Sequence, residues 1–199
     1  NNATVTMSAA SDASTVSSVR LPSASEVQLG KWKVNVSNQD VTFNKLRLYL
    51  DDETGFDTSA GNFGSLSIYE EGKETTALAT ASYLPGTSNG YVEFTGMNWT
   101  VPAGSIKYLV LKGPVNSSGT MNEASYNAWA LGPTSTTNFD VVAGGSNVSA
   151  SSITVSSPTS TYYLFHNSAP KIVKASIGTS LTARPKFSLS LFITTVIVK

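Results

Sequence analysis

The residues best able to do chemistry on their own are acidic side chains in the first third of the chain. Asp51, Asp52 and Asp57 lie close together in the sequence, and carboxylate oxygens are ligands that calcium prefers. These three residues are therefore a weak candidate for a calcium site, although their spacing does not match an EF-hand loop. A solvated acidic loop explains the same residues, and nothing marks a pair of them as the acid and base of a glycosidase.

Histidine and cysteine chemistry is almost absent. The chain has 199 residues, no Cys and a single His, His166, at the end of an aromatic stretch. Without Cys there is no disulfide framework, no thiol nucleophile and no Cys–zinc site. One His offers little for a metal site or a general base. We therefore expect no enzyme activity and no cofactor, and a structural or interface role for His166.

The charge balance excludes one class of partner. Lys and Arg number 13, Asp and Glu number 13, and the net charge is zero. A nucleic-acid partner requires a basic face, so none is expected. Charged residues make up 13% of the chain, against about 25% in an average soluble domain. Together with a 40% hydrophobic share, this composition is typical of an all-β extracellular or cell-surface protein rather than of a disordered chain.

The three tryptophans offer a different kind of site, because aromatic rings can form a platform on which sugars stack. Trp32 alternates with Val34 and Val36, so we expect it in a core. Trp99 and Trp129 are less constrained by the pattern. For these two residues a sugar-binding platform, a core position and a subunit interface all remain open.

Five Asn-x-Ser/Thr triplets are candidate sites of surface glycans. Chance alone gives roughly four triplets in a chain this rich in Asn, Ser and Thr, so the evidence for glycosylation is weak. The candidate residues are Asn2, Asn35, Asn98, Asn116 and Asn147.

The elements that would position these residues are short strands. Apolar and polar residues alternate along the chain, and Gly, Pro and Asn separate the alternating segments, which is typical of a β-sandwich. We expect strands over residues 41–50 and 106–111, with a break at Gly113-Pro114 after the second. A further strand begins at residue 66, and residues 77–83 are its expected partner. We also expect a bulge at Gly30 and a turn at Pro102-Ala103-Gly104 in which Gly takes a positive φ. The predicted core comprises Trp32, Val34, Val36, Phe43, Leu46, Leu48, Leu66, Ile68, Val92, Phe94, Leu109 and Leu111.

The last segment of the chain has an unusual pattern. We expect residues 1–170 to form the sandwich and residues 171–199 to form a C-terminal extension. From 187 to 198 the extension reads as a strand that is apolar on both faces, and it requires burial on both. One face, the candidate donor-strand interface, comprises Phe187, Leu189, Leu191, Ile193 and Ile197. The sequence contains no stretch of about 18 apolar residues, so it predicts no membrane-spanning helix.

The charges are unevenly distributed along the chain. Residues 141–199 contain basic residues and no acid, whereas residues 51–74 contain seven acids and one Lys. Both regions could be ordinary solvated surface. Alternatively, they could attract each other between neighbouring subunits and set the register of an assembly.

Two stretches resemble a known kind of module. Residues 30–46, GKWKVNVSNQDVTFNKL, and residues 101–112, VPAGSIKYLVLK, are similar to strand–turn–strand segments of immunoglobulin-like sandwich modules in secreted bacterial surface and S-layer-like proteins. The resemblance covers roughly residues 1–170 and implies an immunoglobulin-like antiparallel β-sandwich without catalytic content. The extension also resembles the donor strands of filaments in which a terminal strand completes a neighbour's sandwich.

Two functions follow as expectations. The first is a structural subunit of an extracellular filament or surface layer, which polymerises head to tail by donating its C-terminal strand to the next copy. The N-terminal strand, residues 3–7, is the reserve candidate for the donor. The alternative is a carbohydrate-binding or adhesive β-sandwich module of a larger secreted protein.

Overall fold

The computed structural model describes most of the first 165 residues. The chain divides into two units, Asn1–Asn167 and Ser168–Lys199. The second unit, with all five donor-strand residues, lies outside the described residues, and so does His166. The expected boundary near residue 170 therefore stays a prediction. The described residues are 2–10, 19–20, 23–52, 63–86, 90–116, 125–134, 136–157 and 163–165.

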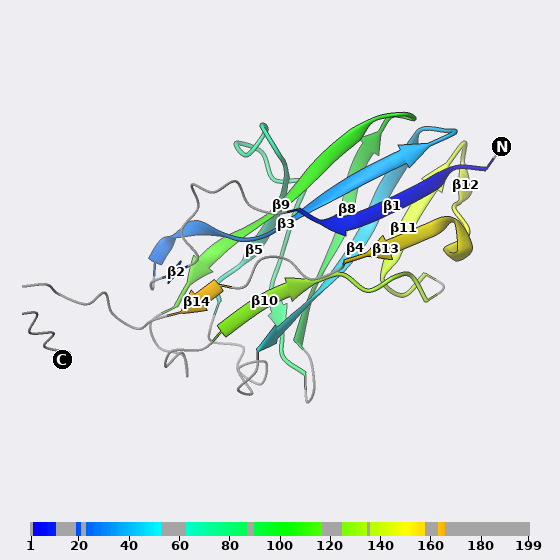
Figure 1. Ribbon diagram of the computed structural model, residues 1–199. Coiled ribbons are helices and arrows are strands. Elements are labelled where there is room, and N and C mark those ends of the chain that lie inside the picture. Colours follow the sequence, from blue (N-terminus) through cyan, green and yellow to red (C-terminus); the bar gives the residue numbers. More distant parts are fainter. Residues whose placement is uncertain are drawn as a thin grey trace, which may run out of the picture. The chain divides into compact units, whose positions relative to one another are not determined.

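The described residues form two β-sheets (Figure 1). In order across sheet A the strands are β13 (Ile153–Ser156), β1 (Thr4–Ala9), β3 (Ser23–Ser37), β9 (Ile106–Val115), β5 (Leu66–Glu70) and β6 (Ala79–Ala81). Sheet B runs in the order β12 (Ser146–Asn147), β11 (Phe139–Ala143), β4 (Val41–Asp52), β10 (Ser125–Trp129), β14 (Tyr163–Phe165) and β2 (Val19–Arg20). On its other side β4 pairs with β8 (Gly90–Val101), which pairs with β7 (Tyr83–Leu84). The expectation of an all-β sandwich is confirmed.

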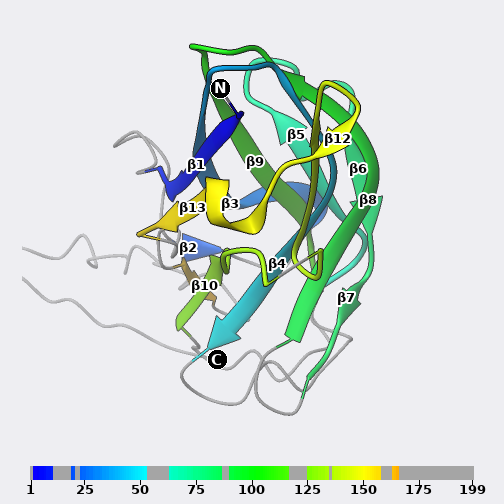
Figure 2. The same ribbon diagram turned by 90° about the vertical axis from the view of Figure 1, so that its right-hand side faces the viewer.

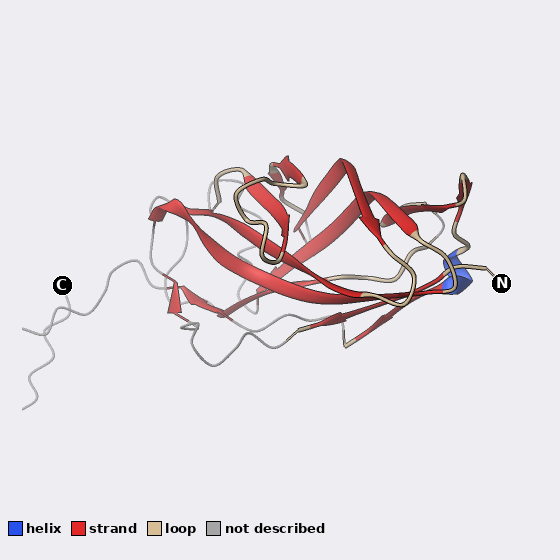
Figure 3. Cartoon of the chain, turned by 90° about the horizontal axis from the view of Figure 1, so that it is seen from above, coloured by secondary structure: helices blue, strands red, loops and turns tan. Residues whose placement is uncertain are grey.

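Strands account for nearly all the regular structure, as Figure 3 shows. The helical element of the described residues is a short 3-10 turn, η3 (Ala150–Ser152). No helix in the described ranges is long and apolar enough to cross a membrane.

The core lies between the sheets, where inward-facing side chains of both meet. All twelve residues predicted for the core are buried. Alternation is the reason, because every second residue of a strand points to the same face. Along β4, for example, Leu46, Leu48 and Leu50 are fully buried, while the residues between them are partly exposed.

Two strand pairs depart from the expected antiparallel pattern. β1 pairs in parallel with β13, and β14 pairs in parallel with β2. Parallel neighbours need a long connection, and here most of the chain lies between the two strands of each pair. The reserve donor strand is also placed by this pairing. β1 lies between β13 and β3 in the chain's own sheet A, with Val5 and Met7 in its own core.

The two sheets are joined along one side of the sandwich by a strand that changes sheets. β6 pairs with β5 in sheet A, and after Ser82 the chain continues as β7, which pairs with β8 in sheet B. Figure 2 shows β6, β7 and β8 on the side opposite to β1 and β13. The sequence predicted a single partner strand from residue 77 to residue 83, which was wrong because the chain crosses between sheets at Ser82.

The expected turns are present. Gly104 has a φ of +74°, and the backbone N–H of Ser105 donates to the carbonyl of Pro102 across 3.2 Å. Asp40, in the loop between β3 and β4, accepts the N–H of Ala103 at 2.8 Å. The expected break at Gly113-Pro114 is absent, since β9 continues to Val115. The carbonyl of Pro114 accepts the N–H of Gly64 at 3.2 Å, a contact that requires no N–H from proline.

Candidate functional site

A row of four apolar side chains crosses the outer face of sheet B. Trp129 of β10 lies opposite Tyr49 of β4, Tyr49 lies opposite Tyr91 of β8, and Tyr91 lies opposite Leu84 of β7. Their neighbours along the strands, such as Leu48 and Val92, are buried, so the four side chains point away from the core. We call Trp129, Tyr49, Tyr91 and Leu84 the aromatic stripe.

The three rings of the stripe form a continuous but twisted surface. The ring centroids of Tyr49 and Trp129 are 5.2 Å apart with an interplanar angle of 35°. Those of Tyr49 and Tyr91 are 6.1 Å apart at 52°. Strands lie about 4.8 Å apart, so the four side chains span roughly 14 Å across the strands. The rings are partly exposed, and Leu84 is 46% exposed.

A row of polar groups runs beside the stripe. Arg47 precedes Tyr49 by two residues on β4 and donates to Glu93 through Nε at 2.9 Å and through Nη2 at 2.6 Å. Its guanidinium lies 4.3 Å from the centre of the Tyr91 ring, a cation–π contact. Burial acts to lower the pKa of Arg47, but its hydrogen bonds to Glu93 and Tyr49 raise that pKa, so the guanidinium stays charged.

Asn138 fixes the middle of the stripe. The hydroxyl of Tyr49 donates to Asn138 Oδ1 at 3.1 Å, and Asn138 Nδ2 donates to the carbonyl of Gly132 at 2.9 Å. The backbone N–H of Arg47 donates to the Asn138 carbonyl at 2.8 Å. The Tyr49 ring is thus held in place before any ligand binds.

Trp129 carries an unsatisfied donor. Its indole Nε1 is buried and has no hydrogen-bond partner among the described residues. An unpaired buried donor destabilises the folded state by about 1–3 kcal/mol relative to a paired one. Such groups are rare in native proteins, so each one calls for an explanation. A twisted aromatic surface with polar groups along one side is suited to a ligand that has both flat apolar faces and hydroxyl-bearing edges.

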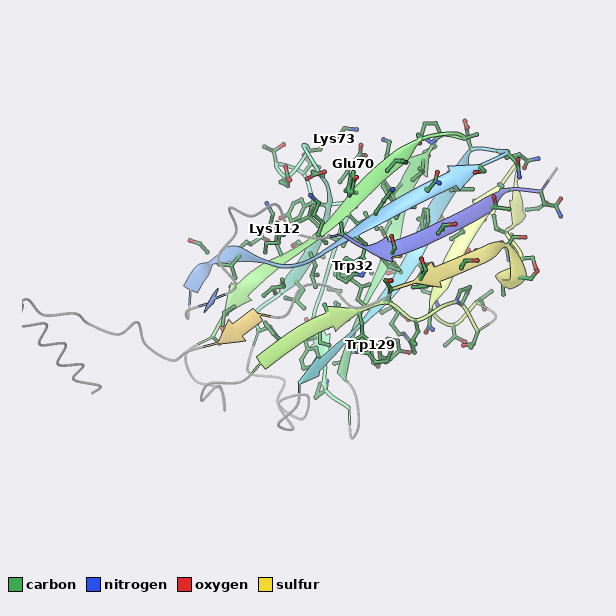
Figure 4. All side chains as sticks on the ribbon, in the orientation of Figure 1. Trp32, Glu70, Lys73, Lys112 and Trp129 are labelled. Carbon is green, nitrogen blue, oxygen red and sulfur yellow. The ribbon has the colours of Figure 1, made fainter. Side chains whose placement is uncertain are left out.

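The other two tryptophans are core residues, and Figure 4 labels one of them, Trp32, among the strands of the sandwich. Trp32 is fully buried, as predicted, and Trp99 is 3% exposed. Trp99 packs on Phe43 with ring centroids 5.2 Å apart, and its Nε1 donates to Glu70 at 2.9 Å. The hypothesis that Trp99 forms part of a sugar-binding platform is therefore wrong. The bulge of β8 between Thr95 and Trp99 turns this side chain inward, and this bulge was not predicted from the sequence.

Glu70 collects three donors at one end of the core. Lys107 Nζ lies 2.7 Å and Lys73 Nζ 3.2 Å from Glu70 Oε1, while Trp99 binds the other oxygen. Burial acts to raise the pKa of Glu70, but the hydrogen bonds from Lys107, Trp99 and Lys73 outweigh it and lower the pKa. Because Lys107 and Glu70 alternate with outward-facing residues, this is an inward-facing ion pair and not a surface site.

Two residues of the acidic region, Glu70 and Glu71, form ion pairs within the chain. Glu70 binds Lys107 and Lys73, and Glu71 forms an ion pair with Lys31. These two acids are thus paired with lysines of the same chain, and attraction between neighbouring subunits stays a prediction. Asp51 and Asp52 end β4, but their side chains and the whole of Asp57 lie outside the described residues, so the calcium candidate stays a prediction.

The aromatic residues on the outer face of sheet A have a different environment. Lys31 lies 5.0 Å from the centre of the Tyr108 ring, and Lys112 lies 5.6 Å from that of Tyr69. The Tyr69 hydroxyl donates to Glu26 at 2.7 Å. Burial raises the pKa of Tyr69, and this hydrogen bond raises it further. Here each ring has a lysine against it, and the two rings do not form a row like that of sheet B.

The candidate glycosylation sites lie on different parts of the sandwich. Four of them, Asn2, Asn35, Asn98 and Asn147, are exposed, and Asn116 is half-buried. Asn98 has a φ of +46° in the bulge of β8, where its Nδ2 donates to the carbonyl of Gly96 at 3.2 Å. Modification of any of them stays a prediction.

Three residues of the stripe, Tyr49, Tyr91 and Leu84, were missed in the sequence. The signal was present in part, because Lys45, Arg47 and Tyr49 alternate with leucines along β4 and must face outward. What the sequence did not show was which strands are neighbours. Without that register, Trp129 and Tyr91 could not be placed on either side of Tyr49.

Comparisons with known proteins give no family. No known protein family and no curated protein matches the chain. One similar solved structure is AvmM, which catalyses macrocyclization in alchivemycin A biosynthesis, with a TM-score of 0.37, 8% identity, and 86% of this chain and 93% of that chain covered. Another is a family 123 glycoside hydrolase from Clostridium perfringens, with a TM-score of 0.32 and 10% identity. The match covers 83% of this chain and 27% of the hydrolase chain.

A third similar structure is the collagen-binding domain of a Staphylococcus aureus adhesin, with a TM-score of 0.25 and 8% identity over 71% of this chain and 95% of that chain. Likeness at these levels assigns neither a family nor an activity. The function must therefore be argued from the residues of this chain.

Proposed function

We propose that this chain is a non-enzymatic, adhesive β-sandwich module of an extracellular protein, which binds its ligand on the outer face of sheet B. The observation that carries the proposal is the aromatic stripe, in which Trp129, Tyr49, Tyr91 and Leu84 lie in one row across four strands. Contiguous exposed apolar surface with a polar margin marks interaction sites on soluble domains.

The rigidity of the face supports binding. Tyr49 is hydrogen-bonded to Asn138, and Arg47 is held by Glu93 and stacks on Tyr91. A ligand therefore orders few side chains when it binds, which reduces the entropic cost of association. The site is shallow, so we expect weak binding by one module and stronger attachment by several copies together.

The test is a binding assay on immobilised extracellular polymers. The purified chain is applied to a panel that contains fibrillar collagen, neutral polysaccharides and acidic polysaccharides. We expect the chain to bind at least one polymer and the variants Tyr91→Ala and Trp129→Ala to lose most of that binding. The matched control is Tyr108→Ala on sheet A, which should bind like the parent chain.

Two results would count against this function. One is that no polymer of the panel is bound; the other is that Tyr108→Ala weakens binding as much as the two stripe variants do. Circular dichroism confirms that each variant is folded, so that loss of structure is not mistaken for loss of a site.

A filament subunit that polymerises through its C-terminal strand is the second candidate. The pattern of residues 187–198, apolar on both faces, favours it, because such a strand needs a sheet to cover it. The core of the described residues is already closed by their own strands, so a donated strand would add to a sheet edge and not fill a groove. β13 is one such edge, and the segment 141–157 around it carries no charged residue.

Deletion of residues 187–199 tests this second function. We expect the full chain to form rods in negative-stain electron microscopy and the truncated chain to remain monomeric in size-exclusion chromatography. Both should show the same thermal unfolding of the sandwich, since the described core contains none of the deleted residues. Rods that persist after the deletion would exclude strand donation by this segment.

A further inference from the structure

We infer that the ligand of the aromatic stripe is a single chain of an uncharged polysaccharide, laid across the strands of sheet B. This inference rests on the proposed adhesive function and names its ligand class. It follows from three properties of the face: the apolar row, the balanced charges beside it and the tilt of the rings.

The apolar row matches the faces of sugar rings. A pyranose presents C–H groups on its flat faces, and the face of an aromatic ring carries partial negative charge, so the two attract when they stack. Successive stripe residues are one strand apart, about 4.8 Å, which is close to the length of one sugar unit. An oligosaccharide that lies along the row can therefore place successive rings over Trp129, Tyr49 and Tyr91.

The polar row matches the hydroxyl edges of the same chain. Arg47 and Glu93 lie two residues from Tyr49 and Tyr91 on the same face, a distance of about 7 Å along the strands. Asn138 lies against Tyr49. Hydroxyl groups on the edge of a stacked sugar would meet these side chains, which offer both donors and acceptors.

The charges of this face argue for an uncharged ligand. Arg47 and Lys45 both contact Glu93, at 2.6 Å and 3.8 Å, and Asp140 lies opposite Lys45 in the register of β11 and β4. Among the described side chains of this row, two cations are thus balanced by two acids. An acidic polysaccharide would have to compete with Glu93 for Arg47. Because the Arg47–Glu93 pair is part-buried, breaking it costs free energy and disfavours binding of the acidic polymer.

The tilt of the rings argues for a single chain. Their planes differ by 35° and 52° between neighbours, so the stripe is not flat. A flat crystalline polymer surface could contact only part of it, whereas a separate, twisted glycan chain can follow all three rings.

Affinity electrophoresis tests the inference directly. The chain is run through native gels that contain soluble neutral polysaccharides (a β-glucan, a xylan, a mannan or a galactan) or the acidic polymers alginate and hyaluronan. We expect at least one neutral polymer to retard the chain and the acidic polymers not to. The retardation should persist in about 0.5 M NaCl, because no ion pair with the ligand is involved.

Variants identify the surface. Trp129→Ala and Tyr91→Ala should weaken binding by about tenfold or more, and Trp129→Phe, which keeps a ring, should restore part of it. Tyr108→Ala should have no effect. Trp32 and Trp99 are buried, so a change in tryptophan fluorescence on adding the neutral polymer should come from Trp129 and should disappear in Trp129→Phe.

The outcomes separate the ligand class from the function. Stripe-dependent binding to collagen alone, or to an acidic polymer alone, would overturn the inference while the adhesive function stands. Stripe-dependent binding to crystalline cellulose but to no soluble chain would overturn the single-chain assignment. No binding to any polymer would count against both.

Discussion

The carboxylate of Glu70 stabilises one end of the core because donors from three different elements converge on it. Lys107 lies at the start of β9, Trp99 lies in β8, and Lys73 lies in the turn after β5. The side chain of Glu70 is only 13% exposed, so loss of its charge would leave Lys107 and Trp99 without their shared acceptor. Removing one partner of such a pair lowers the free energy of unfolding by more than the intact pair adds to it, because the other charge is left buried and unpaired.

The lowered pKa of Glu70 makes the sandwich sensitive to acid. The pKa is lowered in the folded state, so its contribution is fully present above the ordinary value of 4.5 and is lost as the pH falls through the lowered pKa. We expect Glu70→Gln to reduce the free energy of unfolding by about 1–2 kcal/mol at pH 7, and by less as the pH is lowered below that value. Urea denaturation at a series of pH values measures this.

Lys73 provides the matched comparison for Lys107. Its side chain is 66% exposed, against 24% for Lys107, so Lys73→Met should change stability by less than about 0.5 kcal/mol and Lys107→Met by clearly more. Equal effects of the two substitutions, or an unchanged pH dependence in Glu70→Gln, would show that the cluster is an ordinary surface ion pair.

Among the elements, β3 shows how a glycine positions a core residue. The register of β3 against β9 shifts between Gln28 and Gly30, which confirms the predicted bulge. The indole of Trp32 folds back over Gly30, where an added Cβ would lie 2.5 Å from the ring carbon Cη2. The ring is rigid and fully buried, so it has little freedom to move away.

Gly30→Ala should therefore destabilise the sandwich by about 1–3 kcal/mol, the usual cost of overpacking a core. Guanidinium denaturation followed by tryptophan fluorescence measures the loss. Gly132→Ala is the control, because a Cβ there would meet no atom of the described residues within 4 Å. Equal stability of Gly30→Ala and the parent chain would mean that the Trp32 ring can move away from residue 30 without lowering the free energy of unfolding.

The elements also show which parts of the fold could be predicted. Strands with strong alternation, such as β4 and β9, were placed correctly together with their buried residues. β11 and β12 were missed, because residues 116–147 are rich in small polar residues and Gly, and Phe139 and Val141 give only a short alternating pattern. The crossing at Ser82 was also missed, since the sequence pattern of a strand does not show to which sheet it belongs.

At the scale of the whole molecule, the candidate site depends on pairings between distant segments. Trp129 and Tyr91 meet at Tyr49 only because β10 and β8 flank β4. Alternation predicts the face of each residue but not its neighbours across the sheet. The class of the fold could therefore be read from the sequence, whereas the stripe could be recognised only once the strands were in register.

The pairing of β1 with β13 has a consequence for how the molecule is made. Val5 pairs with Ile153, so most of the sandwich must be synthesised between these two partner residues. Contacts of such long sequence separation make folding slow and leave apolar strands uncovered in the meantime. During synthesis, β1 therefore stays without this neighbour until β13 has emerged to pair with it.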